Sequence, residues 1–142
     1  MNTITTSVGI SLYKKEAGLF KALAHPARLA LLDVLSQGEA CVCHLTALLR
    51  LRQPYISQQL MILRRAGLIL PRRDGTVIYY RLALPQVPEL VEAARALLRA
   101  RGVEGTRLTL PDLPLPGCSC PLCTMAALSF SGPGRQREPE DN

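Results

Sequence analysis

Five cysteines lie in two short groups, and they are the residues of this chain best suited to chemistry. Cys41 and Cys43 form a Cys-x-Cys pair, whereas Cys118, Cys120 and Cys123 form a Cys-x-Cys-x-x-Cys group. Thiolates are soft ligands that select soft or borderline metal ions. An odd number of cysteines in such clusters favours ion binding over a disulfide scaffold. We therefore predict all five as candidate ligands of a thiophilic ion.

Other interpretations of the cysteines remain open. A Cys-x-Cys pair near a helix start can be two small buried apolar side chains. The second group can form a site by itself, or the same thiols can form disulfides on oxidation. A thiol oxidoreductase is disfavoured, because no Cys-x-x-Cys begins a strand–helix–strand unit and the chain has only two histidines. Of these, we expect His25 to be structural, at the start of a helix.

The positive charge is concentrated in one part of the chain. Residues 50–81 contain seven arginines and one acidic residue, whereas the remaining sequence has ten basic and ten acidic residues. An arginine-rich segment beside a helical motif is typical of proteins that bind polyanions. A merely solvated basic surface is the alternative, since charge is a non-specific signal.

Hydrophobic periodicity predicts a mainly helical domain over residues 8–101. The expected helices cover residues 11–23, 25–37, 41–50, 53–67 and 87–101. The second of these is apolar on nearly all sides, so we expect it at the centre of the core. An apolar stripe on the last helix favours pairing with a second copy of the chain.

The third and fourth helices are separated by about three residues, which is typical of a helix-turn-helix. On the fourth helix, Ile56, Leu60 and Leu63 share the face expected to be buried. The opposite face carries polar groups suited to base edges and phosphates. The residues expected to contact DNA there are Gln53, Pro54, Ser57, Gln58, Met61 and Arg65.

Residues 68–82 predict a β-hairpin, because strand-forming residues flank the turn signal Asp74-Gly75. Arg72 and Arg73 directly precede this turn, so we expect them to project from the tip and contact the phosphate backbone. A hairpin after a helix-turn-helix predicts a winged helix-turn-helix.

The sequence changes character at about residue 102. Frequent prolines and glycines predict a tail over 102–142 without regular structure, whose last part, 131–142, we expect to be disordered. The chain has no apolar run long enough to span a membrane, and its N-terminus does not resemble a secretory signal. We therefore expect a cytoplasmic protein.

Three motifs make the chain similar to the ArsR/SmtB family of metal-responsive winged-helix transcriptional repressors, over roughly residues 18–100. They are residues 22–29, residues 39–45, and residues 57–60 with 63–68. The second motif resembles the Glu-Leu-Cys-Val-Cys-Asp-Leu box that binds thiophilic ions in arsenic sensors and in cadmium or lead sensors.

This resemblance implies a homodimer, paired through the first and last helices, that binds double-stranded operator DNA. It further implies release by a thiophilic ion, with arsenite or antimonite as the first candidate. A repressor of the same fold that responds to cadmium, to lead or to thiol oxidation is the alternative.

The chain departs from the family at the remaining ligands. Thr46 stands where one type of arsenic sensor has its third cysteine, residues 1–40 contain no cysteine, and residues 87–101 contain no histidine. The resemblance therefore implies a third ligand from the tail. Either one tail cysteine joins Cys41 and Cys43, or the tail group forms a site alone. We expect the composite site, with the tail folding back over the third helix of its own chain or of a second copy. His44 replaces the usual aspartate, and its role is open.

The spacing of the Cys-x-Cys pair constrains how an ion can bridge it. On a regular helix, Cys41 and Cys43 would point about 200° apart. They can share an ion only if the first turn unwinds or if the pair precedes regular helix. A helix N-terminus and nearby arginines predict lowered pKa values for both thiols.

Overall fold

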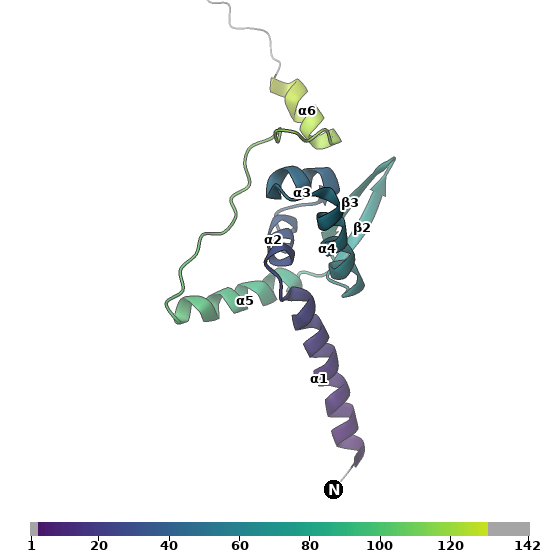
Figure 1. Ribbon diagram of the computed structural model, residues 1–142, viewed down its shortest axis with the longest axis vertical. Coiled ribbons are helices and arrows are strands. Elements are labelled where there is room, and N and C mark those ends of the chain that lie inside the picture. The colour runs from purple at the N-terminus through teal and green to yellow at the C-terminus, as the bar shows by residue number, and fades with distance from the viewer. Residues whose placement is uncertain (1–2, 131–142) are drawn as a thin grey trace, which may run out of the picture.

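The computed structural model describes residues 3–130, so the predicted disorder of residues 131–142 lies outside the described residues. Its elements are α1 (Thr3–Leu23), α2 (Pro26–Leu35), β1 (Ala40–Cys41), α3 (Val42–Leu49), α4 (Gln53–Arg65), β2 (Ile69–Asp74), β3 (Val77–Leu82), α5 (Gln86–Ala100) and α6 (Pro121–Phe130). Figure 1 shows α2 to β3 gathered in one body, with α1 extending from one end and α6 at the other. The predicted mainly helical fold with a β-hairpin wing is confirmed.

Helix α2 forms the centre of the core, as its apolar sequence predicted. Its residues from Leu31 to Leu35 are all buried, and they pack with buried side chains of α4, β2 and α5. The helix begins at Pro26, and the side chain of His25 caps it by accepting a hydrogen bond from the Ala27 amide at 3.1 Å. The structural role predicted for His25 is therefore confirmed.

Helices α3 and α4 form the helix-turn-helix and are separated by three residues, Arg50 to Arg52. Arg50 adopts a left-handed conformation (φ 53°) that ends α3. In α4, Ile56, Leu60 and Leu63 are at most 1 % exposed, which confirms the predicted buried face. This face holds α4 against the core and leaves its opposite face to solvent.

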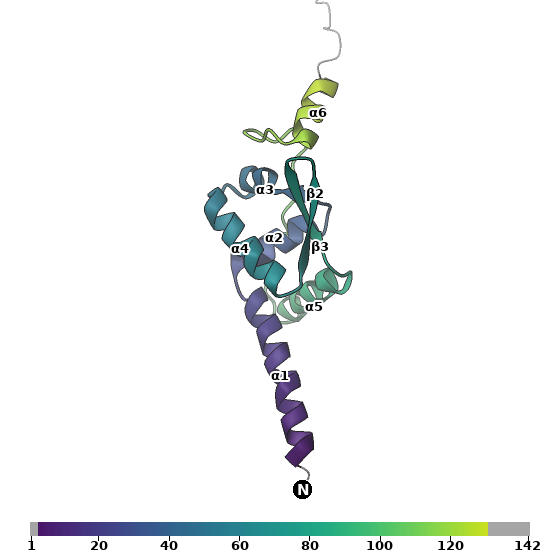
Figure 2. The ribbon, with the colours of Figure 1, turned by 90° about the vertical axis from the view of Figure 1, so that its right-hand side faces the viewer.

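The three strands form an antiparallel sheet in the order β1-β3-β2. Strands β2 and β3 make the predicted hairpin, whose turn uses Gly75 with a positive φ of 59°. The short strand β1 was not predicted; it pairs Ala40 with Tyr80 and Cys41 with Tyr79. Seen from the side, the hairpin lies beside α4 and its turn points toward α6 (Figure 2).

Helices α1 and α5 expose apolar side chains. The most exposed are Tyr13 (68 %), Phe20 (57 %) and Leu97 (65 %). Val87 and Val91 of α5 are buried in the core instead. The apolar stripe predicted for the last helix is thus covered only near its N-terminal end. Within the part of the chain described, no helix is both long and apolar enough to cross a membrane.

The segment after α5 runs along one side of the body and reaches α3 (Figure 1). Its path is anchored at Asp33 of α2, which accepts hydrogen bonds from Arg107 at 2.8 Å and from Arg95 of α5 at 3.1 Å. The prediction that residues 102–142 lack regular structure is wrong over Pro121–Phe130, where α6 forms. Proline is acceptable at the first position of a helix because its missing N–H has no partner there.

Candidate metal centre and nucleic-acid interface

Cys41 and Cys43 lie on either side of the start of α3. Cys41 ends β1 with extended backbone (φ −86°, ψ 166°), and Cys43 is in the first turn of the helix. Because Cys41 is outside the helix, the two side chains are not held 200° apart, and their Sγ atoms are 3.6 Å from each other. The pair can therefore share an ion without unwinding of α3.

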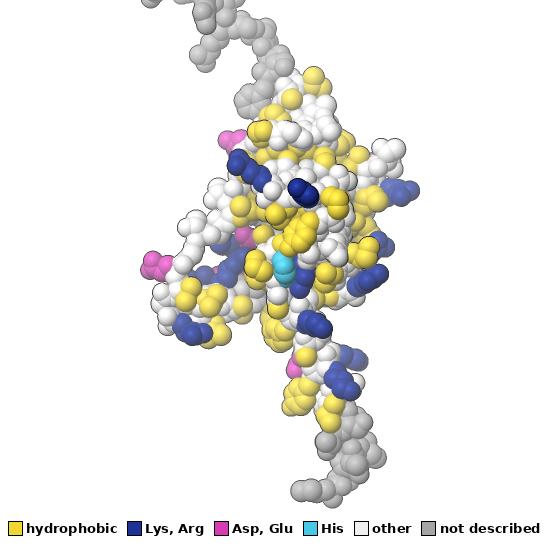
Figure 3. Space-filling model, viewed as in Figure 1, with side chains coloured by type: hydrophobic (Ala, Val, Ile, Leu, Met, Phe, Trp, Pro, Cys, Tyr) yellow, Lys and Arg dark blue, Asp and Glu magenta, His cyan; other side chains and the backbone are white. Residues whose placement is uncertain are grey.

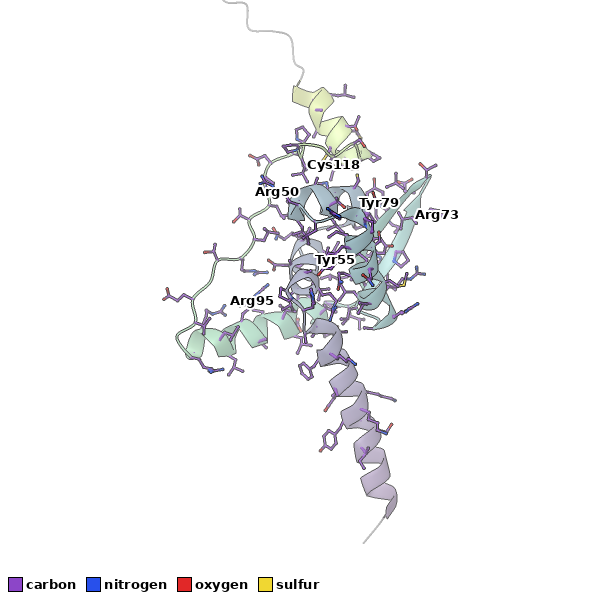
Figure 4. The ribbon with its side chains drawn as sticks, in the orientation of Figure 1. Arg50, Tyr55, Arg73, Tyr79, Arg95 and Cys118 are labelled. Atoms are coloured by element: carbon purple, nitrogen blue, oxygen red, sulfur yellow. The ribbon has the colours of Figure 1, made fainter. Side chains whose placement is uncertain are left out.

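The tail places its three cysteines against this pair. The Sγ atom of Cys118 lies 3.3 Å from that of Cys43, and Figure 4 shows Cys118 above α3, on the side of Tyr79. Cys120 and Cys123 are buried, with 4 % and 1 % exposure. A small apolar cluster surrounds the thiols. It includes Leu48, Val77, Tyr79, Leu113 and Leu115.

The thiols form two overlapping groups of candidate ligands. One group consists of Cys41, Cys43 and Cys120, and the other of Cys118, Cys120 and Cys123 with His44. In each group, all ligand atoms lie within 4.8 Å of one another. The structure thus brings together all five predicted cysteines within one chain and adds His44, whose role the sequence left open.

Burial changes the acidity of these thiols. It raises the pKa of Cys41 and of Cys43 above the ordinary value of 9.0, so the predicted lowering is wrong. Burial also raises the pKa of Cys118 and Cys123, in each case to about 11. For Cys120, burial is outweighed by hydrogen bonds from the Cys123 amide, the Cys118 thiol and His44, which lower its pKa to about 6.

The polar face of α4 is exposed as predicted. Gln53, Pro54, Ser57, Gln58, Met61 and Arg65 are all exposed. The neighbouring Gln59 differs, because it is buried and its Oε1 accepts a hydrogen bond from Arg28 at 2.9 Å. Gln58 thus points to solvent, whereas Gln59 ties α4 to α2.

Of the two wing arginines, only Arg73 is free of the ion pairs described. Arg72 instead donates hydrogen bonds to both carboxylate oxygens of Glu39, at 2.7–3.1 Å. Its guanidinium also lies 4.9 Å from the centre of the Tyr79 ring. The expectation that both arginines project from the tip is therefore wrong for Arg72, whereas Figure 4 shows Arg73 pointing outward from the wing.

Basic side chains dominate the edge of the molecule formed by α4 and the wing. Figure 3 shows dark blue side chains along this edge and none of the magenta acidic ones beside them, whereas the magenta groups lie mainly on the opposite side. Exposed arginines of this region include Arg52, Arg64, Arg65, Arg73 and Arg81. Much of the charge concentration seen in the sequence therefore lies along this edge in the fold, whereas Arg72 is paired with Glu39.

Comparison with known proteins identifies the family. The sequence model described as "Bacterial regulatory protein, arsR family" matches residues 25–69. A biofilm growth-associated repressor of Agrobacterium fabrum is 50 % identical over 82 residues, which cover 58 % of this chain and 70 % of the relative. The chain belongs to the ArsR family. Family membership makes it a transcriptional regulator rather than an enzyme.

Solved structures of this ArsR-family fold agree with that assignment. The crystal structure of Rv0081 from Mycobacterium tuberculosis aligns with a TM-score of 0.60 at 42 % identity, covering 63 % of this chain and 91 % of that one. A homodimeric winged helix-turn-helix domain from Mycobacterium bovis gives a TM-score of 0.62 at 30 % identity, covering 70 % and 93 %. A further relative, found by sequence, is the arsenical resistance operon repressor of Escherichia coli. It is 46 % identical over 71 residues, which cover 49 % of this chain and 60 % of the repressor.

Two residues of this ArsR-family protein were not assigned from the sequence. His44 directly follows Cys43, so proximity to the cysteine pair was an available signal, but it did not show on which side the ring would lie. Glu39 partners Arg72 although 33 residues separate them. No local pattern could have revealed this contact, because it depends on the unpredicted pairing of β1 with β3.

Proposed function

We propose that this protein is a repressor that binds double-stranded operator DNA as a homodimer and is released by a thiophilic ion, with arsenite or antimonite as the effector. In this proposal, residues 8–101 form the DNA-binding and dimerisation domain, and residues 102–142 form a tail that completes the ion site. The exposed residues of α4 read base edges, and Arg73 of the wing contacts phosphate. The exposed apolar faces of α1 and α5 pair with those of a second copy.

The observation that carries the proposal is the convergence of three thiols from separate parts of the chain. Cys41 ends a strand of the wing sheet, Cys43 lies in the first turn of α3, and Cys120 comes from the tail. Three thiols suit trivalent arsenic, because As(OH)₃ exchanges its three hydroxides for three thiolates. Each thiol supplies one proton, three water molecules leave, and no electrons are transferred.

The location of this site supplies a route to the DNA-binding surface. Cys43 belongs to α3, which packs directly on α4. Cys41 pairs with Tyr79 of the wing. Drawing the three sulfurs to one centre therefore displaces the first helix of the helix-turn-helix relative to the wing. A coupling free energy of about 1–3 kcal/mol, typical of allostery, is enough to change operator occupancy substantially.

The test uses a labelled DNA duplex selected from random sequence by the protein itself. We expect arsenite to release the full chain from this duplex. Cys41→Ser and Cys43→Ser should each retain DNA affinity and lose release, and a chain ending at Pro116 should behave in the same way. Cys123→Ser is the matched control, because it removes a thiol outside the three-thiol group and should retain release. A chain ending at Pro116 that still lets go of DNA at the wild-type arsenite concentration would exclude the composite site.

One contact favours thiol oxidation as a second candidate signal. The Sγ atoms of Cys43 and Cys118 are 3.3 Å apart, so a small movement brings them to bonding distance, which is about 2.05 Å. Hydrogen peroxide would take two electrons and two protons from this pair, which gives one disulfide and two waters. Release of DNA by peroxide that disappears in Cys118→Ala would support this alternative, whereas release by arsenite alone would reject it.

A further inference from the structure

His44 and the tail cysteines surround a common point at the start of α3. The Nδ1 atom of His44 lies 4.0 Å from the Sγ atom of Cys118, 3.7 Å from that of Cys120 and 3.5 Å from that of Cys123. All four ligand atoms lie within 4.8 Å of one another. His44, Cys120 and Cys123 are also largely withdrawn from solvent, at 9 %, 4 % and 1 % exposure.

We propose that these four residues form a second metal site, which takes a tetrahedral divalent cation of the zinc class. Three thiolates and one imidazole are a ligand set typical of closed structural zinc sites. The site is distinct from the three-thiol group, because His44, Cys118 and Cys123 do not belong to that group. The four-ligand site itself does not depend on the proposed arsenite response. Only the competition between zinc and arsenite predicted below rests on that proposed function.

The distances agree with tetrahedral coordination. Zinc bonds of about 2.3 Å to sulfur and about 2.0–2.1 Å to nitrogen place those two atoms about 3.6 Å apart across a tetrahedron. The three His44–cysteine distances, from 3.5 to 4.0 Å, bracket this value. The His44 nitrogen therefore lies, to within a few tenths of an ångström, at the distance from each sulfur that such a site requires, and the sulfurs lie within 4.8 Å of one another.

The local backbone around the tail cysteines also suits a metal site. Cys120 directly precedes α6 and Cys123 lies in its first turn, so their thiolates lie at the positive end of that helix. The Leu115 amide donates a hydrogen bond to the Sγ atom of Cys123 at 3.4 Å. Such hydrogen bonds orient metal ligands and contribute to metal affinity.

The site connects two parts of the chain. Cys118, Cys120 and Cys123 come from the tail, whereas His44 comes from α3. Coordination would therefore fasten the tail to the helix-turn-helix. Cys120 belongs to both groups of ligands, so a cation held by the four-ligand site withdraws the thiolate that Cys41 and Cys43 need as their third partner. Zinc and arsenite should consequently compete.

Cobalt(II) provides a direct test of the four-ligand site, because its absorption reports both tetrahedral geometry and thiolate ligation. The full chain, reduced and freed of metal by chelation, is titrated with Co²⁺ and then with Zn²⁺. We expect one Co²⁺ per chain, tetrahedral bands, and displacement by Zn²⁺. Removing a group that only supports a metal ligand typically lowers metal affinity 10–100-fold, so the ligand substitutions His44→Asn and Cys123→Ser should each cost at least about tenfold. Cys41→Ser, the matched control, should bind Co²⁺ within about twofold of the wild type.

The proposal is overturned if Cys41→Ser weakens Co²⁺ binding as much as Cys123→Ser does, or if His44→Asn has no effect on Co²⁺ binding.

Competition between zinc and arsenite is then measured as the arsenite concentration that releases DNA, with and without one equivalent of Zn²⁺. Zinc should raise this concentration at least about tenfold for the wild type and leave it unchanged for Cys123→Ser. An unchanged wild type would overturn the sharing of Cys120. Failure of arsenite to release DNA at all would reject the proposed function, whereas the Co²⁺ titration would still decide the four-ligand site.

Discussion

Cys41 pairs with Tyr79 across the β1–β3 ladder, so a candidate ion ligand and the wing belong to the same sheet. Glu39, which directly precedes β1, extends this connection, since its carboxylate forms an ion pair with Arg72 of β2. The Arg72 guanidinium in turn lies over the Tyr79 ring. Movement of Cys41 on ion binding would therefore act on the wing as well as on α3, which gives the proposed sensor two points of contact with the DNA-binding surface.

The two wing arginines should contribute unequally to DNA binding. Removing one phosphate-binding cation reduces the slope of log affinity against log salt by about 0.9. Arg73→Ala should show this reduction for operator and random DNA alike. Arg72→Ala should show a smaller one, because Glu39 already occupies its guanidinium. Titrations of a labelled duplex at several salt concentrations measure both slopes.

Two further variants control this prediction. Arg99→Ala removes an arginine of α5 that pairs with Glu92, and it should leave the slope unchanged. Glu39→Gln removes the partner of Arg72 and should steepen the slope by up to about 0.9. Equal reductions of the salt slope for Arg72→Ala and Arg73→Ala would mean that the Glu39–Arg72 ion pair opens when the protein binds DNA.

Substitutions of the neighbouring residues Gln58 and Gln59 should distinguish a residue that recognises the DNA sequence from one that stabilises the fold. Gln58→Ala should reduce discrimination between operator and random DNA by about 1–3 kcal/mol, the value of one good base contact, and leave the melting temperature unchanged. Gln59→Ala should lower stability by about 1.5–3 kcal/mol, because it leaves Arg28 without this acceptor. Competition binding and thermal unfolding distinguish the two effects, and a Gln59→Ala protein with unaltered stability would contradict the assignment.

Asp33 should make the free energy of unfolding depend on pH in the acid range. Burial tends to raise its pKa, but hydrogen bonds and charge from Arg107 and Arg95 outweigh burial and hold the pKa below the ordinary value of 3.8. A carboxyl with a lowered folded pKa stabilises the protein above its unfolded pKa, and this stabilisation is lost as the pH falls through the folded value. Asp33→Asn should therefore cost about 1.5–3 kcal/mol at pH 7.

Urea unfolding of the reduced, chelated protein at several pH values tests this expectation. The difference in the free energy of unfolding between the wild type and Asp33→Asn should be constant from pH 7 to about pH 5 and should shrink below about pH 3.8. Arg107 is the more exposed partner, with 54 % of its side chain accessible, so Arg107→Gln should cost less than Asp33→Asn. A difference that persists undiminished at pH 2 would show that the carboxylate charge is not responsible.

The sequence predicted α2 to α5 and the wing well, because their signals are local, whereas α1 begins at Thr3, eight residues before the predicted start at residue 11. The 3.6-residue spacing of Ile56, Leu60 and Leu63 defined the inner face of α4, and Asp74-Gly75 located the hairpin turn. The tail was harder to predict. Its prolines correctly indicated an irregular connection between α5 and α6. They did not predict α6, which begins at Pro121, because proline is also tolerated in the first turn of a helix.

The candidate site was predictable in its composition but not in its geometry. Spacing alone identified the five cysteines, but it could not show that β1 carries Cys41 out of the helix. Nor could it show that the tail returns to the same chain, with Cys118 reaching Cys43 across 75 residues. The thiol pKa prediction failed for a related reason, since burial by Leu115, Tyr79 and the tail depends on contacts distant in the sequence.

The exposed apolar residues of α1 and α5 predict the interface of the proposed dimer. Leu97 is 65 % exposed, so Leu97→Asp should not disturb the core of the single chain. Burying a leucine contributes about 1.5–3 kcal/mol, and a two-fold axis repeats each substitution. The dimer dissociation constant should therefore rise at least about a hundredfold, with a parallel loss of operator affinity. Leu128→Asp on α6, where the leucine is 71 % exposed, is the matched control. Sedimentation velocity should show a monomer for Leu97→Asp and a dimer for Leu128→Asp, and a Leu97→Asp dimer of wild-type strength would exclude this part of α5 from the interface.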